Sequence, residues 1–156
     1  MSFTTKIWIG MILIFLCIQV IQPTHNSSEG ALSTDISEVV IVPKNVHDIL
    51  KVSCYDCHSN KTEYTWYSWV QPGASFRSYH ITKGKNNLNF SEFGSYSKRK
   101  QAHKLQSIIE QVKNELMPIA TYTAFHKKAK LSVADKDLIT VGRIAAILKT
   151  TNSHEN

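Results

Sequence analysis

Cysteine is scarce in this chain, which has three cysteines among its 156 residues. Two of them, Cys54 and Cys57, form one C-x-x-C pair, and the sequence contains no second pair. A structural zinc site usually takes four ligands from two such pairs, so the sequence disfavours structural zinc. A thioredoxin-like redox pair is typical of a βαβ pattern, which does not surround this pair. Two common uses of a C-x-x-C pair are therefore disfavoured.

The chain has fewer acidic than basic residues, and it contains no nucleic-acid-binding motif. Its formal net charge is +6 and its pI is about 9.2. The basic residues gather in two runs, at 98–104 and 125–130. Such runs usually lie on exposed faces, and long-range attraction favours acidic partners. We therefore expect protein partners with acidic surfaces and no nucleic acid.

Internal repeats and alternating runs of β-type residues are absent as well. The composition, with 42% hydrophobic and 19% charged residues, is typical of a globular protein. The length allows one compact domain together with a targeting segment. The sequence therefore predicts an all-α protein with a single small core.

The N-terminus carries an uncharged apolar run at residues 7–21, preceded by Lys6. This pattern is typical of an export element. No A-x-A cleavage site follows, which favours an uncleaved single-pass anchor in the cell membrane, with a cleaved signal peptide and a soluble periplasmic protein as the alternative. The single positive charge before the run predicts that the domain faces the periplasm.

Four segments follow from these patterns. They are a signal-anchor or transmembrane segment at 1–22, a linker at 23–43, a domain that contains the C-x-x-C pair at 44–150 and a tail at 151–156.

Helical periodicity predicts four helices in the domain. The first leads from Pro43 into the cysteine pair, the second covers residues 74–86, the third covers 97–115 and the fourth begins at Ser132. Ser132 and Asp135 have the spacing of a capping box. The apolar face of the third helix is expected at Ala102, Leu105, Ile109, Val112 and Leu116, and that of the fourth at Ala134, Leu138, Val141, Ala145 and Leu148.

A histidine, His58, directly follows the cysteine pair and completes C-x-x-C-H. This is the signature of c-type haem attachment. Two thiols about one turn apart can reach the two vinyl groups on one edge of a porphyrin, and the adjacent imidazole can bind the iron. The pair is therefore interpreted as a covalent haem c site, with Cys54 and Cys57 as thioether links and His58 as the proximal axial ligand.

The sixth iron ligand is expected to be a methionine or a histidine. Met117 is the one methionine after the N-terminal segment 1–22, and it lies 59 residues after His58 and directly before Pro118. We expect it to be the distal ligand, although a lone methionine is otherwise a flexible core residue. His80 is the alternative distal ligand.

Three aromatic residues follow the haem signature closely: Trp66, Tyr67 and Trp69. They could wall the porphyrin and exclude water, which would tune the potential of the iron. Ordinary core packing is the alternative.

The blocks "CYDCHSN", "WYSW", "LNFSEF", "YSKRKQAHKLQSIIEQVKNELMP", "YTAFH" and "AKLS" give the chain a wider likeness. In their order and spacing it resembles the haem-binding domain family of small exported bacterial proteins, from the apolar segment to about Lys149. The resemblance implies one covalently bound haem, with Cys54, Cys57, His58 and Met117 at the site. Thr65 stands where the family often has proline.

The sequence thus predicts a small cytochrome c-like helical domain packed around one haem, preceded by an N-terminal hydrophobic helix. With residues 44–150 as its c-type haem-binding domain, its expected function is that of a monohaem c-type cytochrome that exchanges single electrons with redox protein partners, and a non-enzymatic carrier is favoured over an enzyme. A haem-based sensor or gas-binding module, or a small peroxidase with an open iron, is the alternative.

Overall fold

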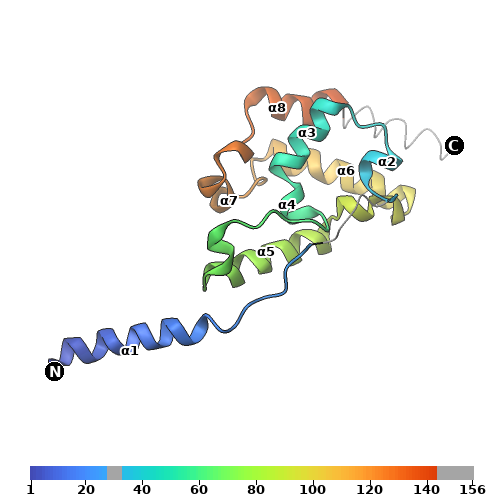
Figure 1. The fold of residues 1–156 in the computed structure, drawn as a ribbon. Helices are drawn as coiled ribbons and strands as arrows, with labels where there is room; N and C mark the ends of the chain where they lie inside the picture. The colour runs from blue at the N-terminus through green and yellow to red at the C-terminus, as the bar shows by residue number, and fades with distance from the viewer. Residues whose placement is uncertain (28–32, 144–156) are drawn as a thin grey trace.

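The computed structural model describes residues 1–27 and 33–143, and in these residues the regular elements are helices (Figure 1). The described part contains no strand, only an isolated bridge between Ser27 and Lys61. The predicted all-α fold class is confirmed.

The helices vary in length from three residues to sixteen. In chain order they are α1 (Phe3–Ile18), α2 (Ile36–Val39), α3 (Lys44–Ser53), α4 (Tyr55–His58), η1 (Trp66–Trp69), α5 (Gly73–Asn87), η2 (Phe90–Ser95), α6 (Lys98–Lys113), α7 (Ala120–Phe125), η3 (Lys127–Ala129), α8 (Val133–Asp137) and η4 (Leu138–Arg143). The first three η elements are 3₁₀-helices, and η4 is a π-helix.

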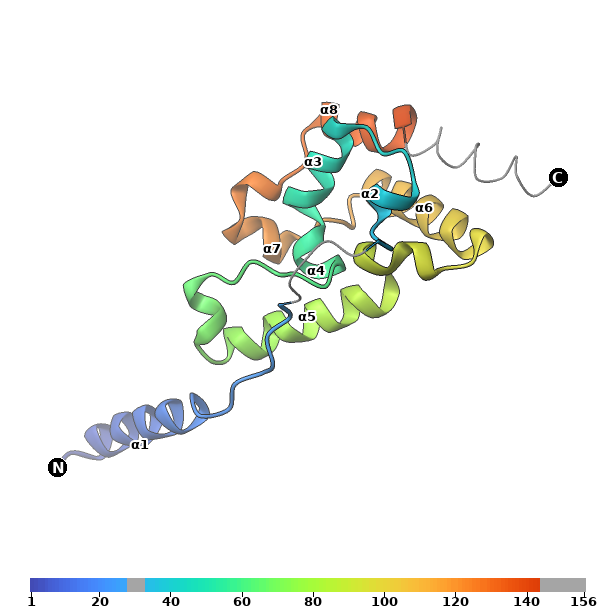
Figure 2. The ribbon, with the colours of Figure 1, turned by 45° about the vertical axis from the view of Figure 1, so that its right-hand side comes forward.

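The N-terminal helix α1 projects away from the other helices (Figures 1 and 2) and buries none of its residues. The predicted N-terminal hydrophobic helix is confirmed. Its 16 residues extend over about 24 Å at the usual rise per residue. None of the helices in the described residues is both long enough and apolar enough to cross a membrane.

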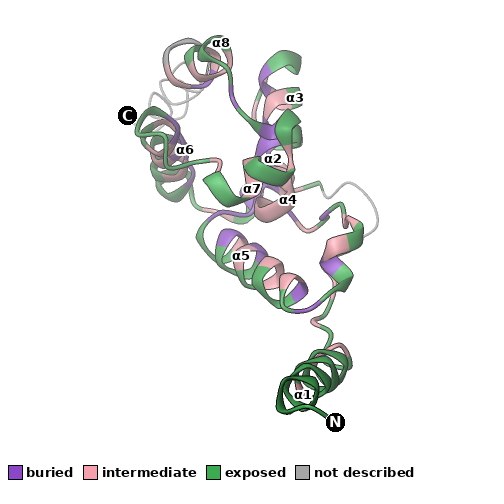
Figure 3. Ribbon diagram, turned by 90° about the vertical axis from the view of Figure 1, so that its left-hand side faces the viewer, coloured by how far each residue is buried: buried purple, intermediate pink, exposed green. Residues whose placement is uncertain are grey.

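One hydrophobic core joins α2, α3, η2, α6 and η4, and Figure 3 shows buried positions on several of the helices that follow α1. The predicted helix after Pro43 is confirmed as α3, which buries Val46 and Leu50. The predicted helix at 74–86 is confirmed as α5. The core consists of Ile36, Val46, Leu50, Leu88, Phe90, Phe93, Leu105, Ile108, Val112, Leu131 and Ile139.

The segment interpreted as a linker is partly folded onto the domain. Ile36 in α2 belongs to the core, and the carbonyl oxygen of Thr34 accepts a hydrogen bond of 2.8 Å from the amide of Gly94 in η2. A helix of four residues makes about one turn, which is too short to show a periodic pattern.

The buried face of α6 differs from the predicted stripe. Leu105 and Val112 are buried as expected, but Ile108 is buried more deeply than Ile109, and Leu116 lies beyond the helix with 56% of its surface exposed. Because residues 108 and 109 are both isoleucine, helical periodicity alone allows either of them to face the core. Gln101 is also buried, because its side-chain amide donates to the carbonyl oxygens of Phe93 and Tyr96. Ala102 is only half-buried.

The capping box at Ser132 and Asp135 is confirmed, with each side chain accepting a hydrogen bond from the backbone amide of the other residue. The buried residue that follows is Ile139 rather than Ala134, which is exposed. Leu138 is half-buried. The side chains of Val141, Ala145 and Leu148 lie outside the described part of the chain.

Candidate functional site

The C-x-x-C-H residues lie on one tight turn, where α3 ends and α4 begins. The backbone amide of Cys54 donates to the carbonyl oxygen of Leu50 at 2.8 Å, which completes the last turn of α3. The carbonyl oxygen of Cys54 then accepts from the amides of Cys57 at 3.2 Å and His58 at 3.0 Å. Residues three and four apart on a helix share a face, so the two thiols and the imidazole are presented together. We call residues 54–58 the cysteine turn.

The cysteine turn opens into a cavity of about 380 Å³. This volume lies within the range of small-molecule and cofactor sites. Cys54, Cys57 and His58 line it, and so do His80 on α5 and Met117 after α6. Every metal-ligating residue that the sequence singled out is therefore brought to one cavity. Its other lining residues are Ser53, Lys83, Gly84, Asn87, Leu88, Phe90, Lys104, Ser107, Ile108, Gln111, Val112, Pro118 and Ile119.

The ring of His58 is oriented by the backbone of α5. Its Nδ1 lies 3.0 Å from the carbonyl oxygen of Leu88. Because a carbonyl oxygen can only accept, Nδ1 carries the proton and Nε2 is left with a free lone pair. Burial lowers the pKa of His58, which favours the neutral ring. A neutral imidazole with its other nitrogen held by a carbonyl is the form in which histidine binds metals.

The two thiols of the turn are reduced, and no disulfide joins them. Burial, reinforced by the neighbouring Cys57, raises the pKa of Cys54 to about 12. Burial and the carboxylate of Asp56 raise the pKa of Cys57 to about 11, although Arg77 opposes this. Both groups are therefore protonated thiols at neutral pH. This differs from the lowered pKa that activates the cysteine of a thiol oxidoreductase.

Gly84 brings α5 close to the cysteine turn. A Cβ atom built at this position would lie 2.4 Å from the carbonyl oxygen of Cys57 and 3.1 Å from its carbonyl carbon. No side chain fits there unless the backbone moves. Figures 1 and 2 show the result, with α4 lying between α3 and α5.

Met117 lies in an irregular segment that begins where α6 ends. The amides of Glu115 and Leu116 donate to the carbonyl oxygens of Val112 at 3.1 Å and Gln111 at 2.9 Å. This pattern is a Schellman motif, with Glu115 in the left-handed conformation at φ 58°. The helix therefore ends at Lys113, earlier than the predicted end at residue 115, and the peptide bond between Met117 and Pro118 is cis. The side chain of Met117 lines the cavity, although 37% of its surface is exposed.

A comparison with protein families places the chain in a family. The family model described as "Haem-binding domain" matches residues 13–142. The chain belongs to the haem-binding domain family. The matched range contains the cysteine turn, α5, α6 and Met117, and with them every residue that lines the cavity. No match was found among curated proteins or among solved structures.

The lining of the cavity fits a haem in its chemistry. Leu88, Phe90, Ile108 and Val112 supply apolar walls for a porphyrin. Lys83 and Lys104, on α5 and α6, are the cationic residues of the described lining, which contains no aspartate or glutamate. Haem carries two carboxylate groups, and lysine ammonium groups at the edge of an apolar cavity suit them.

The aromatic residues predicted to wall the haem lie elsewhere. Trp66, Tyr67 and Trp69 form η1 and none lines the cavity. Trp66 and Trp69 are 78% and 55% exposed. Tyr67 is half-buried, and its hydroxyl is hydrogen-bonded to Arg77 at 3.0 Å and to the ring of His126. The 3₁₀ turn of η1 directs this block away from the cavity, and Leu88 and Phe90 take the place expected for it.

Sequence reasoning missed several residues that shape the site. Gly84 could have been suspected, because an isolated glycine inside a helical pattern often marks a close approach. Phe90 could not be distinguished from other core residues. Asp56, inside the cysteine turn, has no sequence signal for its partners Arg77 and Tyr122, which are distant in the chain.

The left-handed residue Glu115 leads to a prediction about the Met117 segment. Glycine adopts positive φ without the steric cost of a Cβ atom. Glu115→Gly is therefore expected to raise the free energy of unfolding by about 0.5–1 kcal/mol, reduced somewhat by loss of the exposed pair with Lys136. Denaturant unfolding would measure the change, with Glu115→Gln as a control that removes the charge and keeps the Cβ atom. A loss of stability in Glu115→Gly that matches the control would contradict this expectation.

Proposed function

We propose that this protein is a monohaem c-type cytochrome that carries single electrons. Cys54 and Cys57 would hold the haem by thioether bonds, and His58 and Met117 would be its axial ligands. One observation carries the proposal: two protonated thiols, a neutral imidazole and a thioether line one apolar cavity, although Met117 is 59 residues away from His58 in the chain. Haem supplies the reversible one-electron chemistry when bound.

The covalent links require no further reactant. In each, the S–H bond of a thiol would add across a vinyl group, so that the sulfur and the hydrogen become bound to adjacent carbons. The protein's contribution is to present the two thiols one turn apart beside the ring of His58. Their raised pKa values keep both in the S–H form before attachment.

Met117 is favoured over His80 as the distal ligand because of its backbone. The Schellman motif fixes the start of its segment, and Pro118 follows it directly. His80 lies in the interior of α5, where its ring contacts that of Phe76 edge-on at 4.5 Å between centroids. A helix interior offers a side chain less freedom to adjust its approach to the iron. His80 is therefore the second choice.

Gas binding is the competing function, and the partial exposure of Met117 is the observation that favours it. A ligand that is easily displaced would leave the iron open to small molecules. Carbon monoxide binding to the reduced protein separates the two functions. We expect little binding together with a reversible one-electron reduction. Rapid and stoichiometric binding would instead support a gas-binding module.

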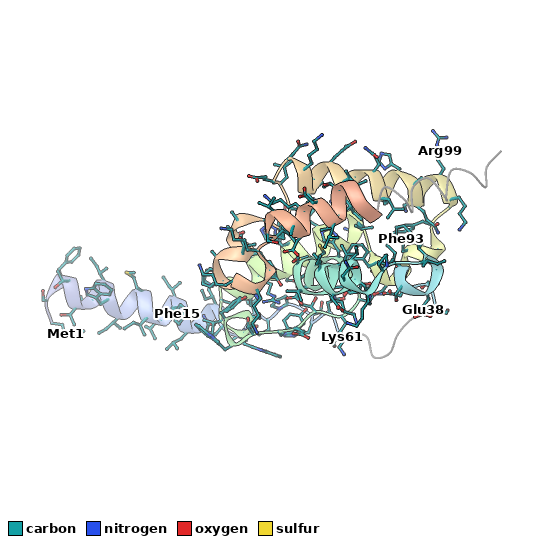
Figure 4. The ribbon with its side chains drawn as sticks, turned by 90° about the horizontal axis from the view of Figure 1, so that it is seen from above. Met1, Phe15, Glu38, Lys61, Phe93 and Arg99 are labelled. Carbon is teal, nitrogen blue, oxygen red and sulfur yellow. The ribbon has the colours of Figure 1, made fainter. Side chains whose placement is uncertain are left out.

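The protein is further proposed to be exported and held at the membrane by its N-terminal apolar segment, which includes α1 and continues beyond it to Ile21. Residues 7–21 are uncharged and apolar, as the export of a c-type cytochrome requires of its leader. An acidic redox partner would meet the basic start of α6, where Lys98, Arg99 and Lys100 are exposed. Figure 4 shows the side chain of Arg99 projecting away from the domain.

A further inference from the structure

Asp56 lies inside the cysteine turn, and three groups surround its carboxylate. Its Oδ2 accepts from the hydroxyl of Tyr122 at 2.8 Å and from Nη2 of Arg77 at 3.0 Å. Its Oδ1 accepts from the backbone amide of Glu63 at 3.1 Å. The side chains of Asp56 and Arg77 are only 16% and 11% exposed. Hydrogen bonds to an ionised group are stronger than neutral ones, and partial burial reduces their screening by solvent.

Tyr122 belongs to α7, which begins two residues after Pro118. It therefore follows Met117 by only five residues. Its ring stacks on that of His126 with 4.1 Å between centroids. Burial and the neighbouring carboxylate of Asp56 raise its pKa, so the hydroxyl keeps its proton and donates to Asp56.

This hydrogen bond connects the two halves of the haem site. Asp56 lies two residues before His58, and Tyr122 lies shortly after Met117. Within residues 1–27 and 33–143, the bond between Asp56 and Tyr122 is the one hydrogen bond between the cysteine turn and residues 114–126. Arg77 on α5 also donates a hydrogen bond to this carboxylate, so the side chain of Asp56 is held in place independently of Tyr122.

We propose that Asp56 and Tyr122 are positioning residues that keep Met117 at the haem iron. The inference rests on the proposed ligation by Met117. Met117 is more than one-third exposed, and the backbone amides of its segment bond back only to the end of α6. Without the hydrogen bond, α7 is no longer tied to the cysteine turn, and the segment between α6 and α7 leaves the cavity more often.

Tyr122→Phe tests the proposal, because it removes only the hydroxyl. Tyr55→Phe is the matched control: Tyr55 is also half-buried, belongs to α4, and donates its hydroxyl to the carboxylate of Asp35 at 3.1 Å. Asp35 lies far from Met117 in the chain. The control therefore removes a comparable hydrogen bond from the cysteine turn. It keeps the hydrogen bond between Asp56 and Tyr122.

The readout is the apparent affinity of the reduced, haem-loaded protein for carbon monoxide. Carbon monoxide binds only when Met117 has left the iron, so its apparent affinity is proportional to the open fraction. We expect Tyr122→Phe to raise that affinity about tenfold, the effect of about 1.4 kcal/mol, and to weaken the absorption band of the methionine–iron bond in the oxidised protein. Tyr55→Phe should leave both unchanged. Asp56→Asn should act in the same direction as Tyr122→Phe.

Equal carbon monoxide affinities in Tyr122→Phe and Tyr55→Phe would overturn the proposal. Met117→Ala distinguishes this failure from a failure of the proposed ligation. If Met117→Ala opens the iron but Tyr122→Phe does not, the positioning role alone is wrong. If Met117→Ala changes neither the spectrum nor the affinity, Met117 is not the ligand and both proposals fail.

Discussion

Replacing Gly84 with alanine is expected to lower the free energy of unfolding of the haem-loaded protein by about 1–3 kcal/mol. The new Cβ atom would lie 2.4 Å from the carbonyl oxygen of Cys57, so α5 and the cysteine turn must separate. Alanine has a helix propensity better by roughly 1 kcal/mol than glycine, which offsets only part of this cost. Denaturant unfolding gives the change in free energy directly.

The same separation should reduce haem loading. The carbonyl of Leu88 that orients His58 belongs to the end of α5, so a displaced α5 also misplaces the imidazole. Gly73→Ala is the matched control on the same helix, because its Cβ atom would meet one backbone atom at 3.1 Å, a gap that a small adjustment relieves. A Gly84→Ala protein as stable and as fully loaded as the wild type would contradict the close packing described here.

Replacing Met117 with alanine is expected to change the iron site without unfolding the domain. Met117 is 37% exposed, so its removal costs less stability than the removal of a fully buried methionine. The reduced protein should then bind carbon monoxide readily. Methionine ligation raises the potential of a haem, so the potential should fall by on the order of 0.1 V, within the range of roughly 0.8 V that axial ligands cover. Spectroscopy and redox titration measure both effects.

His80→Ala is the control for this experiment, because His80 lines the same cavity. It should keep the spectrum and the potential of the wild type. The opposite outcome, in which His80→Ala opens the iron and Met117→Ala does not, would assign the distal position to the histidine.

The haem-attachment chemistry can be predicted from the sequence because the C-x-x-C-H residues occupy five consecutive positions. Cys54, Cys57 and His58 need only one helical turn to come together, and the sequence fixes their spacing. Met117 was found differently. No periodic pattern brings a residue 59 positions away to His58, but the iron of a cytochrome c commonly takes methionine or histidine as its second axial ligand, and the composition limited the choice. The cavity contains both Met117 and His80, so the choice between them stays a prediction.

The end of α6 was predicted only approximately. Pro118 correctly indicated that no helix continues through Met117. The helix ends earlier because Glu115 adopts the left-handed conformation of a Schellman motif. Glycine is the usual residue at that position, and a glutamate gives no such signal in the sequence.

Proximity in sequence misled the placement of the aromatic block. Trp66, Tyr67 and Trp69 follow the cysteine turn within a few residues, yet η1 exposes the two tryptophans and joins Tyr67 to Arg77 and His126. Contacts with side chains that are distant in the chain determine where such an aromatic block packs. The link between Asp56 and Tyr122, 66 residues apart, belongs to the same class and could not be predicted from one sequence.

Covalent attachment of haem at Cys54 and Cys57 is the central claim, and the intact mass of the denatured protein tests it most directly. The protein would be made in a host with c-type haem maturation, beside a variant with both cysteines changed to alanine. We expect the wild type to retain the mass of one haem after acid–organic extraction, and the variant to have the mass of the polypeptide alone. Release of the haem from the wild type by the same extraction would contradict the claim.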